Sequence, residues 1–362
     1  MVRTRSQSGL SAMSWIAIAD ADTRHFSAPD VQGFLPRGSL VIETRLSPEE
    51  RPQTLLAYRE RHPWERSLSL QAIPGGGIVL ITSQNGESAH VALALEASER
   101  ADLLRITYSW DAPARWGRLA IERPERGSVR TVLAPRPHPL WLTDIQTMAT
   151  APHMVQLDGD VEFFAFSDCV EPLGPMPSLA ANVPLLTQGQ YRPVSKLQQG
   201  DLVETVEHGA VPVLAHVSRT VPARGSFRPV RLRAPYFGLQ QDIIVAPDQK
   251  LVVSKPMVEY MFGCEAVLVP ARHLVNGTSA IWQDLKLTTT YHQLVLPEHE
   301  TLIAAGSALE SLFIGRIRRK PENLAQSLLG PLLRNSLPEH MLSAHPVLRP
   351  FDAITLVEQS AA

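Results

Sequence analysis

The sequence predicts an all-β protein of two domains, and three observations lead to this fold class. A chain of 362 residues is most simply divided into two domains, and 44% hydrophobic residues let each bury a sizeable core. Short apolar runs separated by turn residues recur at even spacing in both halves, which is typical of β-sandwiches and β-barrels. Helical periodicity is nearly absent before residue 316.

Charge and cysteine content narrow the possible functions. The chain has 34 basic and 36 acidic residues, so its charge gives no reason to expect a nucleic-acid partner. Cys169 and Cys264 cannot supply a disulfide framework, and we expect both to be unpaired because they lie on opposite sides of the predicted domain boundary. No CxxC pair or Cys/His cluster is present, so we expect neither a metal nor a cofactor.

No segment of the sequence identifies a compartment. The first apolar run, Met13–Ala19, is too short and too poorly flanked for a signal peptide, and no stretch is long enough for a transmembrane helix. We therefore expect no membrane partner and a cytoplasmic location by default, with non-classical secretion left open. The oligomeric state has no signal in the sequence.

Residues 38–168 are predicted to form a β-sandwich, preceded by an N-terminal segment over residues 1–37 with few periodic features. Ser67–Gln71 alternates strictly between polar and apolar residues, and Ile78–Thr82 is a nearly continuous apolar run; both patterns favour strands. One short helix is expected at Thr143–Met148. The predicted strands span residues 39–46, 54–58, 67–71, 78–82, 90–95, 103–110, 116–121 and 161–166, and the last of these closes back near the first.

Two of these segments, Thr107–Asp111 and Gly117–Ile121, place a strand with Trp before a strand that begins Gly-x-Leu. This order is similar to that of concanavalin-type and laminin G-like sandwiches. The resemblance implies a lectin-like domain whose ligand would be a glycan or a protein. Trp64, Trp110 and Trp116 are candidates to line a sugar site, although their interpretation as sandwich core and rim is favoured.

A Pro-rich linker, residues 169–177, precedes a second all-β unit at residues 178–315. This unit opens with a hairpin whose turn lies at Gly189, followed by a Gly-Asp turn at Gly200. The tail, residues 316–362, is predicted to carry short helices. Further strands are expected at residues 202–205, 211–217, 230–233, 243–245, 251–253 and 266–270, and short helices at 307–312, 323–329 and 331–335.

Four segments of this second unit form a set: Ser178–Asp201, Asp242–Val253, Val267–Gly277 and Leu294–Glu300, the last of which is followed by the short runs Ala304–Gly306 and Glu310–Ser311. Together they resemble the Hint domain, the self-processing module of Hedgehog proteins and inteins, and they match its bacterial branch closely. That family typically begins with a nucleophilic Cys, and Ser178 stands in its place.

The resemblance implies that the first side chain of the domain attacks the preceding carbonyl, here Ser178 on Pro177. A serine hydroxyl is a weak nucleophile at its free pKa and needs a base. Gln249 occupies the His position of the family's Thr-x-x-His motif, and an amide does not exchange a proton near neutral pH. His292 lies one residue away from the His of a Tyr-x-His step, so on a strand it points to the opposite face. His299 occupies the position that the family pattern gives it. It is either a catalytic or a structural histidine, and the structural role is favoured.

The candidate catalytic residues are therefore Ser178, Gln249 and His299, in a site that we expect to be degenerate. No His-Asn pair ends the domain, so splicing by asparagine cyclisation is not expected. At most we expect one intramolecular self-cleavage without turnover. Two alternatives stay open: active cleavage of the Pro177–Ser178 bond, and a module that binds a glycan or a protein through the N-terminal sandwich.

Overall fold

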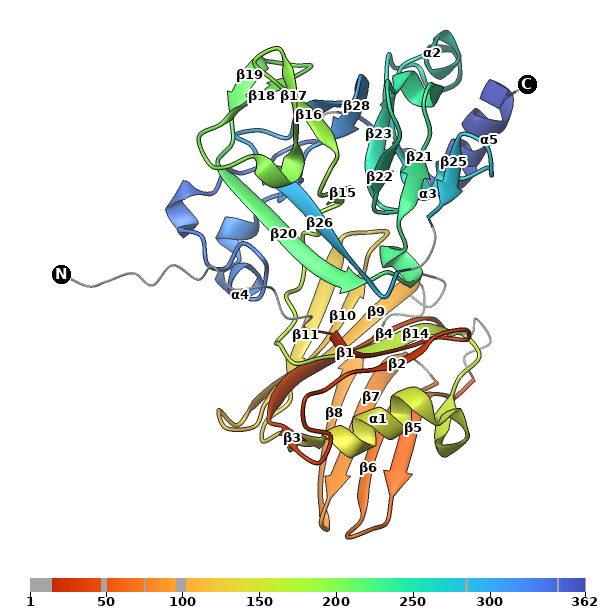
Figure 1. The fold of residues 1–362 in the computed structure, drawn as a ribbon, viewed down its shortest axis with the longest axis vertical. Helices are drawn as coiled ribbons and strands as arrows, with labels where there is room; N and C mark the ends of the chain where they lie inside the picture. Colours follow the sequence, from red (N-terminus) through yellow and green to blue (C-terminus); the bar gives the residue numbers. More distant parts are fainter. Residues whose placement is uncertain are drawn as a thin grey trace, which may run out of the picture. The chain divides into compact units, whose positions relative to one another are not determined.

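The computed structural model describes residues 15–46, 51–74, 76–95, 102–283, 286–343 and 345–361. The chain divides into two compact units, whose principal boundary lies between Glu171 and Pro172. Both units are built from antiparallel sheets with few and short helices, as the sequence predicts (Figure 1). Residues 1–14 of the predicted N-terminal segment lie outside the described residues. In the described part of the chain, no helix combines the length and the hydrophobicity needed to span a membrane.

Two sheets make up the N-terminal unit as a lectin-like sandwich. The seven-stranded sheet has the order β11-β10-β9-β4-β14-β1-β2, and the five-stranded sheet has the order β13-β5-β6-β7-β8. A short pair, β3 with β12, lies outside both. The strands are β1 Trp15–Ala19, β2 Arg24–Phe26, β3 Phe34–Leu35, β4 Arg37–Arg45, β5 Gln53–Glu60, β6 Arg66–Ala72, β7 Gly77–Gln84, β8 Glu87–Ala94, β9 Leu103–Asp111, β10 Trp116–Arg123, β11 Ser128–Leu133, β12 Leu140–Trp141, β13 Val155–Leu157 and β14 Val161–Ser167.

The burial of these strands follows their sequence patterns. In β6, buried residues alternate with half-buried ones, because one face of the five-stranded sheet packs inward. The central strands β4 and β9 are buried on both faces over nearly their whole length, which explains their continuous runs. The predicted helix is present as α1, Leu142–Thr150.

The N-terminal unit also includes three strands, β1, β2 and β3, from the segment 1–37 that was predicted to precede the sandwich. β1 lies between β14 and β2 in the seven-stranded sheet, and all five of its residues are buried. A strand buried on both faces has no polar–apolar alternation, so Trp15–Ala19 reads only as a short apolar run. The assignment of this segment as a stretch outside the sheets is therefore corrected.

The three tryptophans considered for a sugar site have different surroundings. Trp110 is completely buried, stacks on Tyr108 with ring centroids 5.4 Å apart, and donates its indole N–H to the Leu35 carbonyl at 3.0 Å. Trp116 is half-buried, with the Arg118 guanidinium 5.7 Å from its ring centroid. Trp110 is thus a core residue, whereas Trp64 is 40% exposed.

The second unit consists of two further sheets. The six-stranded sheet has the order β20-β26-β15-β22-β21-β25; the eight-stranded one has β17-β16-β27-β28-β23-β24, with β18 joined to β27 and β19 to β18. The strands are β15 Leu179–Ala180, β16 Pro184–Thr187, β17 Gln190–Pro193, β18 Leu202–Thr205, β19 Gly209–Pro212, β20 Ala215–Pro222, β21 Val230–Leu232, β22 Ile243–Val245, β23 Lys250–Val253, β24 Val267–Pro270, β25 Ala280–Trp282, β26 Thr288–Val295, β27 Thr301–Ala304 and β28 Ser307–Glu310. The helices are α2 Pro256–Phe262, α3 Ala271–Leu274, α4 Pro321–Ala325 and α5 Pro350–Ala361.

Two-residue turns set the hairpins of this unit. Gln188-Gly189 joins β16 to β17 with φ angles of 46° and 78°, and Ala305-Gly306 joins β27 to β28 with 48° and 90°. Positive φ at both central residues is the signature of a type I′ turn. Glycine is favoured at the second central position of this turn, because it adopts positive φ without strain. The second turn overturns the helix predicted at residues 307–312, because the chain folds back and Ser307–Glu310 pairs with β27 instead. The strand predicted at residues 211–217 is likewise split, between β19 and β20.

The tail is less helical than predicted at residues 323–329 and 331–335. α4 ends at Ala325, after which the Ser327 hydroxyl donates to the Leu324 carbonyl at 2.8 Å. Such local side-chain bonds compete with helical hydrogen bonding. The tail packs on β20 and β26 through a small apolar cluster of Ala215, Val217, Val295, Leu312, Ile314, Leu324, Leu329 and Leu337.

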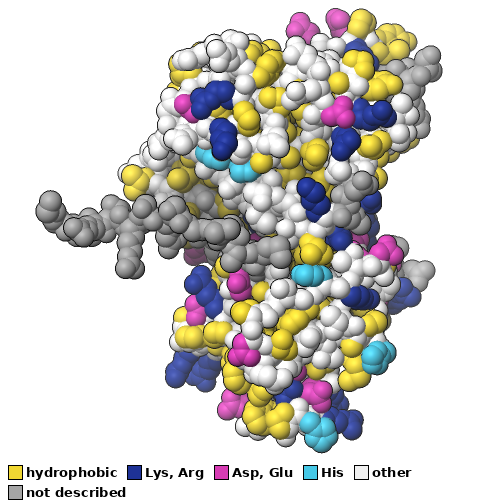
Figure 2. All heavy atoms as spheres, in the orientation of Figure 1, with side chains coloured by type: hydrophobic (Ala, Val, Ile, Leu, Met, Phe, Trp, Pro, Cys, Tyr) yellow, Lys and Arg dark blue, Asp and Glu magenta, His cyan; other side chains and the backbone are white. Residues whose placement is uncertain are grey.

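Cys169 and Cys264 are free thiols, as predicted. On the face shown in Figure 2, basic and acidic side chains are intermixed over both units. This view agrees with the near balance of 34 basic and 36 acidic residues in the sequence.

Candidate functional site

Ser178 is held at the start of β15, which pairs with both β22 and β26. Leu179 lies opposite Val245 on one side and His292 on the other. The Ser178 carbonyl accepts a hydrogen bond from the Ala246 N–H at 2.7 Å. Ser178 is only 9% exposed, so the two sheet partners place its hydroxyl in the interior of the unit.

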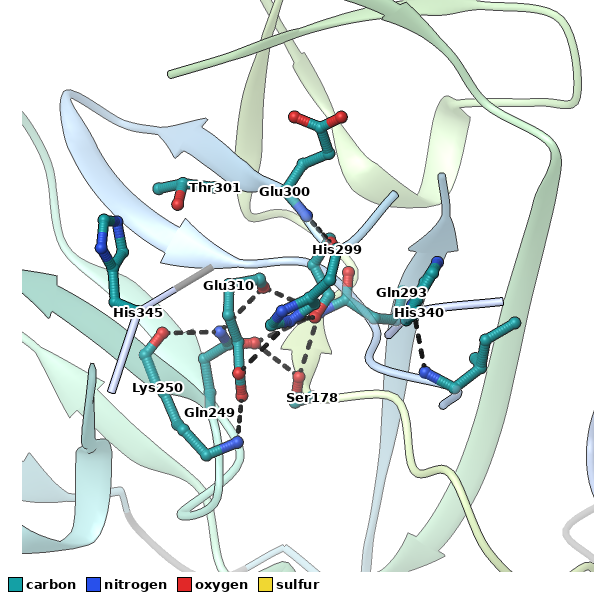
Figure 3. Close-up of polar contacts among 12 residues, drawn as sticks. Ser178, Gln249, Lys250, Gln293, His299, Glu300, Thr301, Glu310, His340 and His345 are labelled. Carbon is teal, nitrogen blue, oxygen red and sulfur yellow. Dashed lines mark hydrogen bonds and ion pairs between the residues drawn. The ribbon is translucent and has the colours of Figure 1, made fainter. Parts of the chain in front are cut away.

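Gln249, in the turn between β22 and β23, is completely buried and contacts this hydroxyl. Its Nε2 donates to the carbonyls of Lys250 at 2.9 Å and Glu310 at 3.1 Å. These two bonds fix the orientation of the amide, so that its oxygen faces Ser178. The Ser178 hydroxyl donates to Gln249 Oε1 at 2.5 Å (Figure 3).

Gln293 on β26 is the second amide at the serine. The register of β15 with β26 puts it opposite Ser178, one step beyond the Leu179–His292 pair, and opposite residues share a face. Gln293 Nε2 donates to Ser178 Oγ at 3.2 Å and to Gln249 Oε1 at 3.3 Å. Its own oxygen accepts from the Leu294 N–H at 3.0 Å, which holds the amide in this orientation.

His292 points away from the serine, as strand alternation predicts. Its Nδ1 lies 3.0 Å from Nε2 of His216, and the two rings stack with centroids 5.2 Å apart. Burial lowers the pKa of both imidazoles. His292 therefore belongs to a histidine pair on the other face of β26.

His299 belongs to the same buried cluster through Glu310. Its Nε2 lies 3.2 Å from the Ser311 carbonyl and 3.6 Å from Glu310 Oε2, and its ring meets the Phe313 ring edge-on with centroids 5.1 Å apart. Glu310 also accepts from Lys250 Nζ at 2.7 Å (Figure 3). Since the Glu310 backbone carbonyl accepts from Gln249 and Gln293 as well, this residue links the histidine to the two amides.

A second histidine, His340, is buried beside His299, with ring centroids 6.0 Å apart. Burial is the main cause that lowers the pKa of His340. The neutral ring is consistent with its contacts: Nδ1 accepts from the Ile314 N–H at 3.2 Å, and Nε2–H donates to the Leu296 carbonyl at 3.1 Å. Both ring nitrogens are thus used to tie the tail to the strands.

The surroundings of the serine decide what this cluster can do chemically. In the part of the chain that the structure describes, Gln249 and Gln293 are the hydrogen-bond partners of the Ser178 hydroxyl. Amides do not take up a proton near neutral pH, so none of the described residues in hydrogen-bond contact with this oxygen is a general base. Of the three residues singled out from the sequence, Ser178 and Gln249 meet directly, and His299 lies one residue further along the network.

Sequence reasoning missed Gln293, Lys250 and Glu310. For Gln293 a signal existed, because the alternation that turns His292 away leaves the next residue facing the serine. Glu310 belongs to a run that resembles the family, but its segment is predicted as a helix and becomes β28 only through the Ala305-Gly306 turn, so its place in the site was missed.

Comparison with known proteins bears on the two units separately. The family model described as "Hint domain" matches residues 177–316. Among solved structures, the second half is similar to the MchDnaB-1 intein (N145AA), with 10% identity over 37% of this chain and 98% of the intein, and a TM-score of 0.25. No curated protein matches the chain.

The N-terminal half is similar to other solved structures. The sialidase CBM40 of Ruminococcus gnavus, bound to α2,3-sialyllactose, shares 16% identity over 43% of this chain and 88% of its own, with a TM-score of 0.29. The LG1–3 region of the laminin α2 chain is similar over 83% of this chain, more than the N-terminal half alone, and over 55% of its own length, with 8% identity and a TM-score of 0.26.

The sequence match extends over the strands that hold Ser178, Gln249 and Gln293 in one network. Residues 177–316 of this chain are therefore a Hint domain.

Proposed function

We propose that this Hint domain keeps the fold of the self-processing modules but is arrested before the first acyl shift. That shift forms a bond between Ser178 Oγ and the Pro177 carbonyl carbon and breaks the Pro177–Ser178 amide. The hydroxyl proton must leave Oγ, and the amide nitrogen must receive one. Both transfers call for groups that exchange protons near neutral pH.

One observation carries this proposal: the Ser178 hydroxyl donates to Gln249 Oε1 at 2.5 Å. The two amides around Ser178 hold the hydroxyl as a structural donor and acceptor, because each of them is itself oriented by backbone groups. Glu310, the nearest carboxylate in the network, is engaged by Lys250 and His299. The nucleophile, Gln249 and His299 are thus a vestigial set that now stabilises the domain.

The single variant Ser178→Cys tests whether the block lies in the amides or in the weak nucleophile. We expect the variant to stay intact when incubated with a thiol at neutral pH, because Gln249 and Gln293 still surround residue 178 without exchanging protons. Intact-mass spectrometry over several days measures this. Thiol-dependent release of residues 1–177 from this single variant would show that the serine alone arrests the domain.

A second candidate function belongs to the sandwich: we propose that it binds a glycan at an aromatic cluster. Phe34 is 48% and Trp64 is 40% exposed, and both pack edge-on against Trp141 with centroids 4.5 and 5.5 Å away. The Arg66 guanidinium lies 4.7 Å from the centroid of the Trp141 ring. Exposed rings beside a few polar groups are typical of small-ligand sites.

One polar atom of this cluster supports the same function. The indole Nε1 of Trp141 is buried and has no hydrogen-bond partner among the described residues. A buried donor without an acceptor is rare in folded proteins and points to a partner that binds there.

Glycan-array binding by the full-length chain tests this second function. We expect Trp64→Ala to weaken binding about tenfold, because a stacking ring contributes roughly 0.5–1.5 kcal/mol beyond its buried area. Leu133→Ala is the matched control, since Leu133 is 66% exposed and belongs to β11, outside the cluster. Equal binding by the parent and Trp64→Ala would rule out this surface.

A further inference from the structure

We infer that the Hint domain carries a divalent metal site formed by His208, Glu298 and Glu300. One ligand atom from each of these side chains lies within 4.8 Å of the others. An imidazole with two carboxylates is a donor set for zinc and similar transition metals, whereas calcium and magnesium prefer oxygen alone. The inference does not depend on whether Ser178 reacts.

His208 and Glu300 are 92 residues apart in the sequence, and a strand pairing brings them together. His208 lies in the turn between β18 and β19, and the two glutamates precede β27. β18 pairs with β27 through Thr205 and Leu302, and the Val206 N–H donates to the Thr301 carbonyl at 3.0 Å. This explains why the sequence, which has no compact metal motif, gives no sign of the site.

The burial of Glu300 is the second observation that points to a cation. Its side chain is only 2% exposed, and among the described residues its ionic partner is the imidazole of His208 rather than an Arg or a Lys. Both carboxylate oxygens lie 3.1 Å from Nδ1 of His208, whose own side chain is 57% exposed. Buried carboxylates are ordinarily paired with a cation or bound to a metal, because leaving the charge uncompensated is costly.

The geometry allows closure around an ion without rebuilding the backbone. Zinc holds nitrogen and oxygen ligands at about 2.0–2.2 Å, so the three atoms must converge slightly. His208 and Glu298 are both exposed and can rotate toward Glu300, which is fixed. Its backbone N–H donates to Ser311 Oγ at 3.0 Å, which anchors this residue.

The site is separate from the serine. Figure 3 shows the Glu300 carboxylate pointing away from Ser178, whereas its neighbour His299 points toward Glu310. Three protein ligands would leave one position of a tetrahedral zinc for water. A metal here would tie the β18–β19 turn to the start of β27 and stabilise the domain.

Calorimetric titration of the chelator-treated full-length chain with Zn²⁺ tests the inference. We expect one saturable site per chain, and we expect His208→Ala and Glu298→Ala each to weaken binding about 100-fold. Both replaced side chains are exposed, and Glu298→Ala leaves the contact between His208 and the buried Glu300 carboxylate in place, so this variant still tests the site if His208→Ala does not fold. His345→Ala is the matched control, because His345 lies nearby at 3.9 Å from Glu207 but outside the cluster, and its binding should equal that of the parent.

A second readout compares the melting temperature of each protein with and without Zn²⁺, so that differences in stability between variants do not enter the comparison. Saturating Zn²⁺ should raise the melting temperature of the parent and the His345→Ala variant by about 5 °C, and Mg²⁺ should not. The same Zn²⁺ should leave the melting temperature of His208→Ala unchanged. No saturable Zn²⁺ binding by the parent, or equal binding by His208→Ala and Glu298→Ala, would overturn the site.

Discussion

The variant that combines Ser178→Cys, Ala246→Thr, Gln249→His and Gln293→His is expected to cleave itself when a thiol is added. Each proton-transfer group is commonly worth about 10²–10⁴ in rate, and this variant regains two of them together with a thiolate nucleophile. The existing geometry supports the exchange, because Gln249 and Gln293 both lie within 3.2 Å of the Ser178 oxygen. The expected products, residues 1–177 and 178–362, are separated by mass.

Two controls make this reconstruction informative. Ser178→Cys alone keeps both amides and should stay intact, so the gain would be assigned to the changes at residues 246, 249 and 293. The same combination with Ser178→Ala has no nucleophile and should also stay intact. A folded reconstruction that fails to cleave would show that more than these four positions arrests the domain.

In the sandwich, Arg66→Ala is expected to cost about 3–5 kcal/mol of unfolding free energy. Arg66 donates two hydrogen bonds to Asp144, at 2.8 and 2.9 Å, and their side chains are only 8% and 12% exposed. Without the guanidinium, the Asp144 carboxylate keeps one bond, from the Tyr58 hydroxyl at 3.2 Å. A buried carboxylate that loses its cation is strongly destabilising.

Urea denaturation followed by tryptophan fluorescence measures this loss, since most of the six tryptophans lie in the N-terminal unit. Arg59→Ala is the matched control. Its pair with Glu65 is as short, at 2.5 Å, but the two side chains are 59% and 50% exposed, so at most about 1 kcal/mol is expected. Equal losses in the two variants would contradict the role assigned to burial.

Much of the fold follows from local patterns in the sequence. β6 shows strict alternation and β7 a nearly continuous apolar run, and both are strands where these patterns predict them. The errors arise where a tertiary contact or a turn overrides the pattern. Ser307–Glu310 has helical spacing but pairs with β27, and β1 lacks alternation because it is buried on both faces.

The candidate site was predictable only in part. Ser178 and Gln249 could be selected from the family pattern, and strand alternation turned His292 away. Glu310 is part of the family pattern as well, but its contact with the site could not be predicted, because its position depends on the hairpin that follows β27. Local sequence does not encode which carbonyl two amides will share, and the Glu310 carbonyl is the acceptor that both use.

The intact mass of the unmodified protein tests the central claim, an arrested Hint domain, most directly. The purified chain is incubated for days with and without a thiol or hydroxylamine, and its intact mass is then measured by mass spectrometry. An arrested domain gives one species at 39.9 kDa under every condition, because the Ser178 hydroxyl is held by amides that move no proton. Two fragments that meet at Pro177–Ser178 would contradict this account and show that the serine is an active nucleophile.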